Sequence, residues 1–141
     1  MDDSFAAKSS FNSKNDNLKR RTKDFALRII RLVESLPKTQ TAHIIGGQLL
    51  RSGTSVPANY RAACRARSNA EFIAKIGIVE EETDESVSWI EMLVDSNLIK
   101  HELVADLMDE GNQLTAIWVT SINTARGKKR EVRTPPSALR T

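Results

Sequence analysis

The sequence predicts an all-α protein, folded as an antiparallel up-down-up-down four-helix bundle with a kinked second helix. Four segments between residues 18 and 126 repeat apolar side chains at helical spacing. No window shows the alternation of β-branched and polar residues, bounded by turns, that predicts a strand. The connections between the four segments are short, which favours antiparallel neighbours.

The first helix is expected from residue 18 to residue 36, because Pro37 disfavours helical geometry at the residue before it. Its apolar stripe, spaced by about 3.6 residues, is Phe25, Ile29, Leu32, Val33 and Leu36. The basic face opposite this stripe, spread over roughly 100° of the helix, is Arg20, Arg21, Arg28 and Arg31. We expect this face to point outward.

The second helix begins near Thr39 and runs into the stretch RSGTSVPANYRAACRARSN. Gly53 and Pro57 interrupt it. Inside a helix, a glycine costs about 1 kcal/mol relative to alanine and a proline about 3 kcal/mol. We therefore expect a kink between these two residues.

The third and fourth helices have clear end signals. Ser68 and Glu71 form a capping box at the start of the third helix, and an apolar stripe follows them. The fourth helix is expected from His101 to Arg126, with apolar residues in near-heptad register. Gly127 then occupies the position typical of a C-terminal cap.

The segments that flank the bundle differ from it in composition. Residues 1–17 are rich in Ser, Asn and Asp, lack sustained apolar periodicity and are expected to be disordered. Residues 127–141 contain two prolines and are expected to form a flexible basic tail. Residues 18–126 are therefore expected to form one four-helix bundle domain.

Composition indicates a cytoplasmic protein. The single cysteine, Cys64, excludes an intramolecular disulfide, and the N-terminus lacks the apolar stretch of a signal peptide. No apolar run approaches the roughly 20 residues that are needed to span a bilayer. We expect no membrane segment.

The net charge of +3 conceals a segregation of charge along the chain. Residues 37–70 contain five basic and no acidic residues, whereas residues 71–110 contain twelve acidic and two basic residues. A chain polarised in this way either pairs its charges on folding or presents a basic surface to an acidic partner such as nucleic acid.

Two rows of opposite charge are expected on the second and third helices. The basic row is Arg51, Arg61 and Arg65, and the acidic row is Glu80, Asp84, Glu91 and Asp95. We expect the rows to pair across helices or subunits, because a guanidinium group fits a carboxylate in a bidentate manner. The alternative is that some of these arginines stay free to bind phosphate.

Trp89 lies on a face of the third helix that is removed from its apolar stripe, together with Ile78 and Met92. A monomer would leave these groups in water, so we expect a contact with another subunit and a homo-oligomer. The alternative is that they are scattered surface residues, which are ordinary in soluble proteins.

The basic face of the first helix has few acidic neighbours in the sequence. The same is true of the basic residues of the tail, which are Lys128, Lys129, Arg130 and Arg133. Binding of nucleic-acid phosphates by these groups would be sensitive to salt and largely blind to sequence. The alternative is a solvated basic face without a partner.

No residue pattern predicts an active site, a metal site or a cofactor. The residues three positions before His43 and His101 are Gln40 and Leu98, so the Glu-x-x-His pairs of di-metal bundles are missing. Neither histidine follows an arginine at the short spacing that helical toxin ribonucleases use. Cys64 has no histidine near it in the sequence and is expected to be a small core residue.

The stretch LLRSGTSVPANYRAACRARSNAEFIAKIGIVEEETDES resembles a family of four-helix bundle proteins encoded in intervening sequences of bacterial 23S ribosomal RNA genes. The residues that fit the core pattern of the family are Ser55, Val56, Pro57, Asn59, Arg67, Glu71 and Phe72. The chain departs from the common form between Ala63 and Arg65, where many members have Glu-Gly.

The resemblance implies an antiparallel four-helix protomer, a homopentamer and a basic outer surface that binds nucleic acid. The accessory variability determinant of diversity-generating retroelements is similar in fold, and there the partner is a reverse transcriptase with its RNA. A partner protein of that kind is therefore a further expectation.

These observations predict a non-enzymatic, oligomeric helical-bundle protein that binds RNA or DNA weakly and without sequence preference, as a binder or an adaptor. The alternative is a protein-protein interaction scaffold that does not bind nucleic acid.

Overall fold

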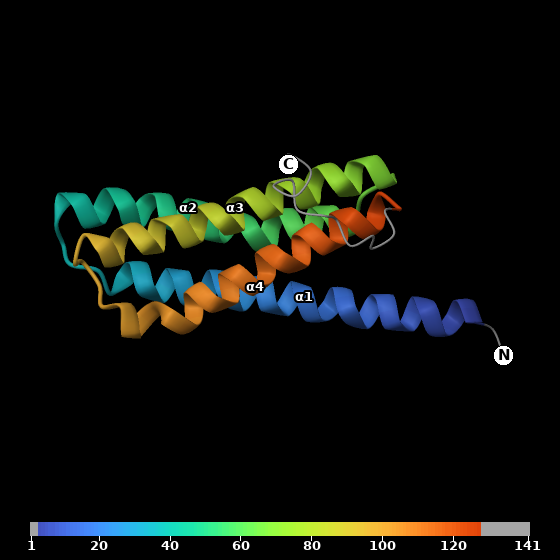
Figure 1. Ribbon diagram of the computed structural model, residues 1–141, viewed down its shortest axis with the longest axis horizontal. Helices are drawn as coiled ribbons and strands as arrows, with labels where there is room; N and C mark the ends of the chain where they lie inside the picture. Colours follow the sequence, from blue (N-terminus) through green and yellow to red (C-terminus); the bar gives the residue numbers. More distant parts are fainter. Residues whose placement is uncertain (1–2, 128–141) are drawn as a thin grey trace, which may run out of the picture.

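The protein is a bundle of four long helices. The computed structural model describes residues 3–127, with side chains described from residue 13 onward. The helices are α1 (Asp3–Glu34), α2 (Gln40–Cys64), α3 (Asn69–Asp95) and α4 (His101–Ala125). Successive helices run in opposite directions (Figure 1). No strand occurs in residues 3–127, so the predicted all-α four-helix bundle is confirmed.

The helix starts follow the local sequence. Thr39 caps α2 by accepting a hydrogen bond from the N–H of Ala42 at 3.2 Å. Ser68 caps α3 by accepting from the N–H of Glu71 at 3.1 Å, and the carboxylate of Glu71 accepts from the N–H of Arg67 at 3.0 Å. The cap predicted at Ser68 therefore forms.

The first helix is longer than the sequence analysis expected. Residues 3–17 were expected to be disordered, whereas α1 begins at Asp3. This segment contains no glycine or proline, and a helix that has already formed extends at little cost through such residues. The tail beyond residue 127 lies outside the described residues.

Pro57 lies inside α2, which continues through it to Cys64 as one helix. A proline has no N–H to donate within the helix, so the carbonyl four residues earlier loses its usual partner. Just before the proline, the hydroxyl groups of Thr54 and Ser55 donate to the carbonyls of Leu50 and Arg51, both at 2.7 Å. Such bonds to the preceding turn are typical of bent or locally strained helices.

Two glycines let the helices pack closely at the centre of the bundle. A Cβ atom at Gly53 of α2 would lie 2.6 Å from Cδ1 of Ile29 in α1. A Cβ atom at Gly111 of α4 would lie 2.5 Å from Cγ2 of Val87 in α3 and 3.3 Å from the ring of Phe25 in α1. The largest side chains of the core are Trp118, Phe25, Ile29, Leu49, Ile76, Ile90, Leu93 and Leu114.

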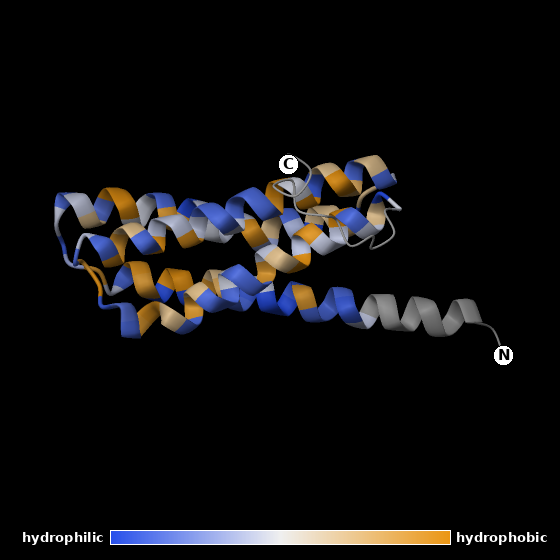
Figure 2. Ribbon diagram, in the orientation of Figure 1, coloured by the Kyte–Doolittle hydropathy of each residue, from blue (hydrophilic) through white to orange (hydrophobic). Residues whose placement is uncertain are grey.

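Buried polar groups inside the bundle pair with one another. The indole N–H of Trp118 donates to Oγ1 of Thr83 at 3.0 Å, which links α4 to α3. The hydroxyl of Ser86 lies 2.9 Å from that of Ser52, which links α3 to α2. Apolar and polar residues alternate along every helix where side chains are described (Figure 2), as expected for amphipathic helices.

The four helices do not pack equally. The α2–α3 contact is the most extensive and the α1–α4 contact is the smallest. The N-terminal part of α1 diverges from the C-terminal part of α4 at the end of the bundle where α1 begins (Figure 1). This divergence creates the groove described below.

Candidate nucleic-acid interface

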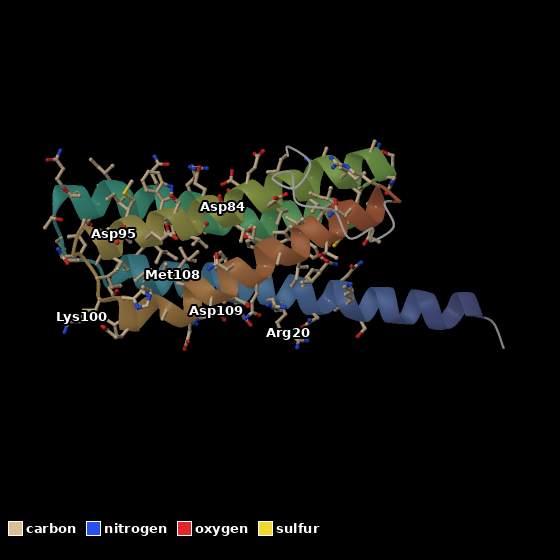
Figure 3. The ribbon with its side chains drawn as sticks, in the orientation of Figure 1. Arg20, Asp84, Asp95, Lys100, Met108 and Asp109 are labelled. Atoms are coloured by element: carbon tan, nitrogen blue, oxygen red, sulfur yellow. The ribbon has the colours of Figure 1, made fainter. Side chains whose placement is uncertain are left out.

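The basic face of α1 is open to solvent. Arg20 and Arg31 are exposed and Arg28 is half-buried, and none of the three makes an ion pair with a described carboxylate. Arg20 points away from the bundle (Figure 3). Asp84 of the acidic α3 lies at the opposite edge of the bundle in the same view. Three of the four arginines predicted on this face are therefore available to an external partner.

Arg21 differs from the other three arginines because it is paired. Its Nη2 lies 2.6 Å from Oε1 of Glu110, and its Nε donates to Oε2 of the same carboxylate at 3.1 Å. These hydrogen bonds raise the pKa of Arg21 above its ordinary value. The bidentate pair joins α1 to α4, so Arg21 is a structural contact and the prediction that it belongs to the free basic face needs correction.

Acidic residues lie within and beside the basic face. Asp24 is one helical turn from both Arg20 and Arg28, although it forms no ion pair with either. Asp16 and Glu34 are one turn from the two ends of the row. These carboxylates lower the positive potential of the face. The tail residues expected to add to this face, Lys128, Lys129, Arg130 and Arg133, lie outside the described residues.

The charges between α2 and α3 pair differently from the prediction. Arg51 contacts Glu82 at 3.3 Å and also pairs with Glu85. The predicted acidic row was Glu80, Asp84, Glu91 and Asp95. At 100° per residue this row lies roughly 160–220° around α3 from Glu82, so it faces away from α2.

Two members of the predicted acidic row line a second groove instead. Glu80 and Asp84 lie with Arg126 along a groove of about 640 Å³ between α3 and α4. Arg61 and Arg65 are exposed and make no ion pair with any carboxylate among the described residues. The expected pairing of the two rows within one protomer therefore does not form.

An apolar surface covers part of the α2–α3 pair. Ile44 is 56% exposed and Met92 is 53% exposed, and Ile78 is exposed as well. Trp89 is half-buried and packs against the core, so the expectation that a monomer would leave it in water needs correction. Its indole nitrogen is buried without a hydrogen-bond partner in the described part of the chain. The sequence singled out Trp89, Ile78 and Met92 but missed Ile44, which belongs to a different helix.

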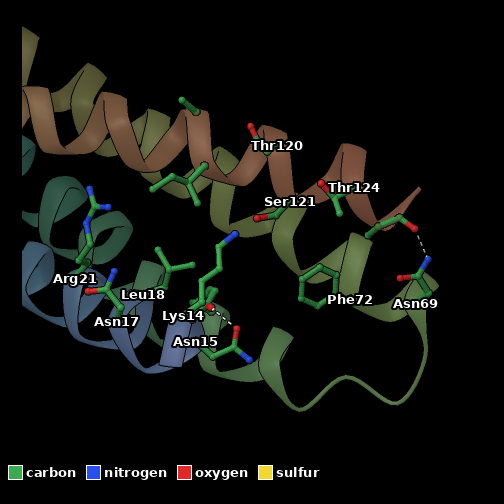
Figure 4. Close-up of a pocket in the computed structure, with 14 residues that line it drawn as sticks. Lys14, Asn15, Asn17, Leu18, Arg21, Asn69, Phe72, Thr120, Ser121 and Thr124 are labelled. Atoms are coloured by element: carbon green, nitrogen blue, oxygen red, sulfur yellow. Dashed lines mark hydrogen bonds between the residues drawn. The ribbon is translucent and has the colours of Figure 1, made fainter. Parts of the chain in front are cut away.

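A groove of about 700 Å³ opens between α1 and α4, above the ends of α2 and α3 (Figure 4). Lys14 and Arg21 line it from α1, Phe72 from α3 and Ser121 from α4. Tyr60 of α2 forms part of its floor and is almost fully buried. This groove was not predicted, because no local pattern in the sequence reports the distance between the first and last helices.

The described residues do not assemble a metal centre. They contain no group of three or more His, Cys, Asp or Glu side chains placed to hold a metal ion.

Burial raises the pKa of Tyr60 above its ordinary value, and a hydrogen bond with Cys64 raises it further, so the phenol stays protonated. None of the described helices has the length and apolar character needed to cross a membrane.

A model of the 23S rRNA-intervening sequence protein family matches residues 14–120. The chain therefore belongs to the 23S rRNA-intervening sequence protein family. The resemblance noted in the sequence is thus confirmed. A solved structure from Bacteroides thetaiotaomicron VPI-5482, of a protein with unknown function from the S23 ribosomal protein family, is also similar. That structure has a TM-score of 0.70 and 32% sequence identity, over 74% of this chain and 97% of the other. No curated protein matches the chain.

The residues on which the resemblance in the sequence rests support the fold. The amide of Asn59 donates to the carbonyl of Ser55 at 2.9 Å, so both residues stabilise α2 around Pro57. Arg67 and Glu71 form the start of α3. These residues therefore stabilise the α2–α3 hairpin.

Proposed function

We propose that this protein is a non-enzymatic, oligomeric helical-bundle protein that binds the phosphates of RNA or DNA weakly and without sequence preference. The observation that supports this function is the solvent-facing row of Arg20, Arg28 and Arg31 on α1, without ion-paired carboxylates among the described residues. Arginine is well suited to phosphate, because its planar fork makes two hydrogen bonds to one group.

The geometry of the row fits contacts with a backbone and not with base edges. Arg20 and Arg31 are 11 positions apart in the sequence, about 16 Å along α1 at 1.5 Å per residue. Contacts spread along one helix face in this way reach successive phosphates. Each neutralised phosphate releases counterions, so affinity falls as salt rises.

A protein-interaction scaffold is the second candidate, and the apolar surface of α2 and α3 favours it. Ile44 and Met92 are more than half exposed, and Trp89 has a buried indole N–H without an acceptor in the described part of the chain. A partner subunit would cover the apolar side chains and could supply a carbonyl to Trp89. The two functions use different faces, so an oligomer held by α2 and α3 leaves the basic face of α1 free.

A salt series tests the proposed function. Filter binding to a 20-nucleotide RNA and to duplex DNA is compared for the wild type and for the double variant Arg20→Glu/Arg31→Glu, using about 50 to 200 mM salt. We expect the variant to bind both nucleic acids more weakly and with a shallower salt slope, because the slope counts the phosphates contacted.

The matched control reverses two charges elsewhere. Lys38 and Lys100 are exposed residues in the connections between helices, so Lys38→Glu/Lys100→Glu makes the same change in net charge. We expect this control to keep the salt slope of the wild type. Equal slopes for both double variants, or no retention of either nucleic acid at low salt, would contradict phosphate binding by α1.

A further inference from the structure

We propose that the groove between α1 and α4 holds one unstacked base of a single-stranded nucleic acid, while the strand's phosphates follow α1. This inference rests on the proposed function and adds to it a site and a preference for single strands. Its starting point is the groove of about 700 Å³ that lies beside the basic face. Small-molecule sites have volumes of about 300–1,000 Å³, so a nucleotide fits this space.

The groove offers an aromatic surface at its base. Phe72 is half-buried and lines the groove from α3 (Figure 4). Tyr60 lies beneath the groove with its ring 5.1 Å from that of Trp118, so it is held inside the core. Phe72 is therefore the ring that remains for a base. Stacking on such a ring is the main way in which proteins hold bases of single strands.

The walls of the groove provide hydrogen-bonding groups that match base edges. Asn15 accepts from the Tyr60 hydroxyl at 3.3 Å, which leaves its amide N–H groups free to donate. Asn69 donates to the carbonyl of Ala125 at 2.5 Å, which leaves its amide oxygen as an acceptor. Ser121 and Thr124 add hydroxyl groups from α4. Donors and acceptors on two sides suit the polar edge of a base.

The charge of the groove favours a phosphate-linked ligand. Lys14 and Arg21 line the groove, and none of the described residues that line it is acidic. Arg21 is neutralised by Glu110 at the inner end, so Lys14 supplies the uncompensated charge. Lys14 is six positions before Arg20, about 9 Å along α1 and about 120° around it, so a strand that leaves the groove must pass around α1 to reach both residues.

The geometry favours a single strand over a duplex. A duplex keeps its bases stacked and paired, and taking one base out requires breaking those interactions. A single strand already exposes its bases. The groove therefore makes the binding of single strands stronger than that of duplexes, although both contact the basic face of α1.

A mononucleotide titration tests the groove without depending on the basic face. Amide resonances of the full chain are followed by NMR as AMP is added, and ribose 5-phosphate, which lacks the base, is added in parallel. We expect AMP to shift the resonances of Asn69, Ser121 and Thr124 and ribose 5-phosphate to leave them in place. No shift at these residues with AMP would overturn the proposal, and so would equal shifts with both compounds, which would indicate an anion site alone.

A pair of matched variants then tests the preference for single strands. Ser121→Phe fills the groove, and Ser88→Phe puts the same side chain on an exposed position of α3 that lines neither groove. We expect Ser121→Phe to weaken binding of a single-stranded RNA about tenfold or more, with little change for duplex DNA and an unchanged salt slope. Ser88→Phe should behave as the wild type in both assays.

The remaining outcomes separate this proposal from the proposed function. Wild-type binding of RNA with a normal salt slope, together with no effect of Ser121→Phe, overturns the groove and leaves phosphate binding by α1 in place. A change in the sedimenting mass of Ser121→Phe, without a loss of RNA binding, also overturns it, because the groove would then be a contact between copies of the chain. Thermal unfolding of both variants confirms that they are folded.

Discussion

The α2–α3 pair and the α1–α4 pair of this bundle differ in how tightly they close. Between α2 and α3, Ser52 meets Ser86 in the interior and Arg51 pairs with two carboxylates at the surface. Between α1 and α4 the contact is small, and among the described residues a single ion pair, Arg21 with Glu110, joins the two helices. The closed pair is held by contacts in its interior and at its surface, and the open pair leaves room for the groove beside the basic face.

The difference separates a pair of helices with an extensive contact from a pair whose opening leaves space for a ligand. In the α2–α3 pair the buried hydroxyl groups of Ser52 and Ser86 satisfy each other, so the interior of this pair has no open space for a ligand. The opening between α1 and α4 exposes hydrogen-bonding groups of both helices and one side of the half-buried Phe72 of α3. The same bundle can therefore keep a well-defined core and still present a binding surface.

The largest expected effect is on stability, from a substitution where α4 packs most closely against its neighbours. Gly111→Ala adds a methyl group 2.5 Å from Val87 and 3.3 Å from Phe25, so the neighbouring helices must move apart. We expect a loss of about 1–3 kcal/mol in the free energy of unfolding, measured by urea denaturation. The change also opens α4 further from α1 and α3.

Gly77→Ala is the matched control for this loss. No atom lies within 4 Å of a Cβ built at Gly77, which is also inside a helix. Here the gain in helix propensity acts alone, and we expect a stabilisation of up to about 1 kcal/mol. Stabilisation by both substitutions would show that α4 is not held at contact distance and would contradict the packing described here.

The fold could be predicted from local patterns to a large extent. Apolar stripes located all four helices, and Ser68 with Glu71 located the start of α3, because both signals depend on neighbours in the sequence. The start of α1 was not predicted, since a polar segment without glycine or proline is equally compatible with coil or with a helix that extends from residue 18.

The candidate site could be predicted only in part. The exposed arginines of α1 followed from helical geometry, but the partner of Arg51 did not. Spacing shows which residues share a face of α3, whereas the rotation of α3 against α2 decides which face meets Arg51. Glu110 and the α1–α4 groove depend on contacts between the two helices that are farthest apart in the sequence, and no local pattern reports them.

The next effect concerns the floor of the groove. Burial raises the pKa of Tyr60 in the folded protein above the ordinary value of about 10, and the unfolded chain has the ordinary value. The contribution of protonated Tyr60 to the stability of the folded protein is complete below about pH 10. It is lost as pH rises above this value, because only the unfolded chain ionises there. We expect the free energy of unfolding to fall by up to about 1.4 kcal/mol per pH unit in this range.

Tyr60→Phe is the variant that identifies the source of this loss. It keeps the ring against Trp118 and removes the titrating hydroxyl. Urea denaturation between pH 9 and pH 11 should show a shallower loss of stability for this variant than for the wild type, apart from the contribution of other groups. If the free energy of unfolding falls equally with pH in both proteins, the Tyr60 hydroxyl is open to water in the folded protein. The groove would then lack a closed floor.

The smallest expected effect concerns the ion pair of Arg21 with Glu110, the only one that joins α1 to α4 among the described residues. The side chains of Arg21 and Glu110 are 27% and 20% exposed, so solvent screens part of their attraction. Glu110→Gln should therefore reduce the free energy of unfolding by no more than about 1 kcal/mol, and added salt should make this difference from the wild type smaller.

The same substitution leaves Arg21 without its counter-charge beside the groove, so we expect tighter binding of single-stranded RNA and a steeper dependence of that binding on salt. A variant that loses stability but binds RNA with the slope of the wild type would show that Arg21 does not reach the strand, and would limit the phosphate contacts to Lys14 and the outward face of α1.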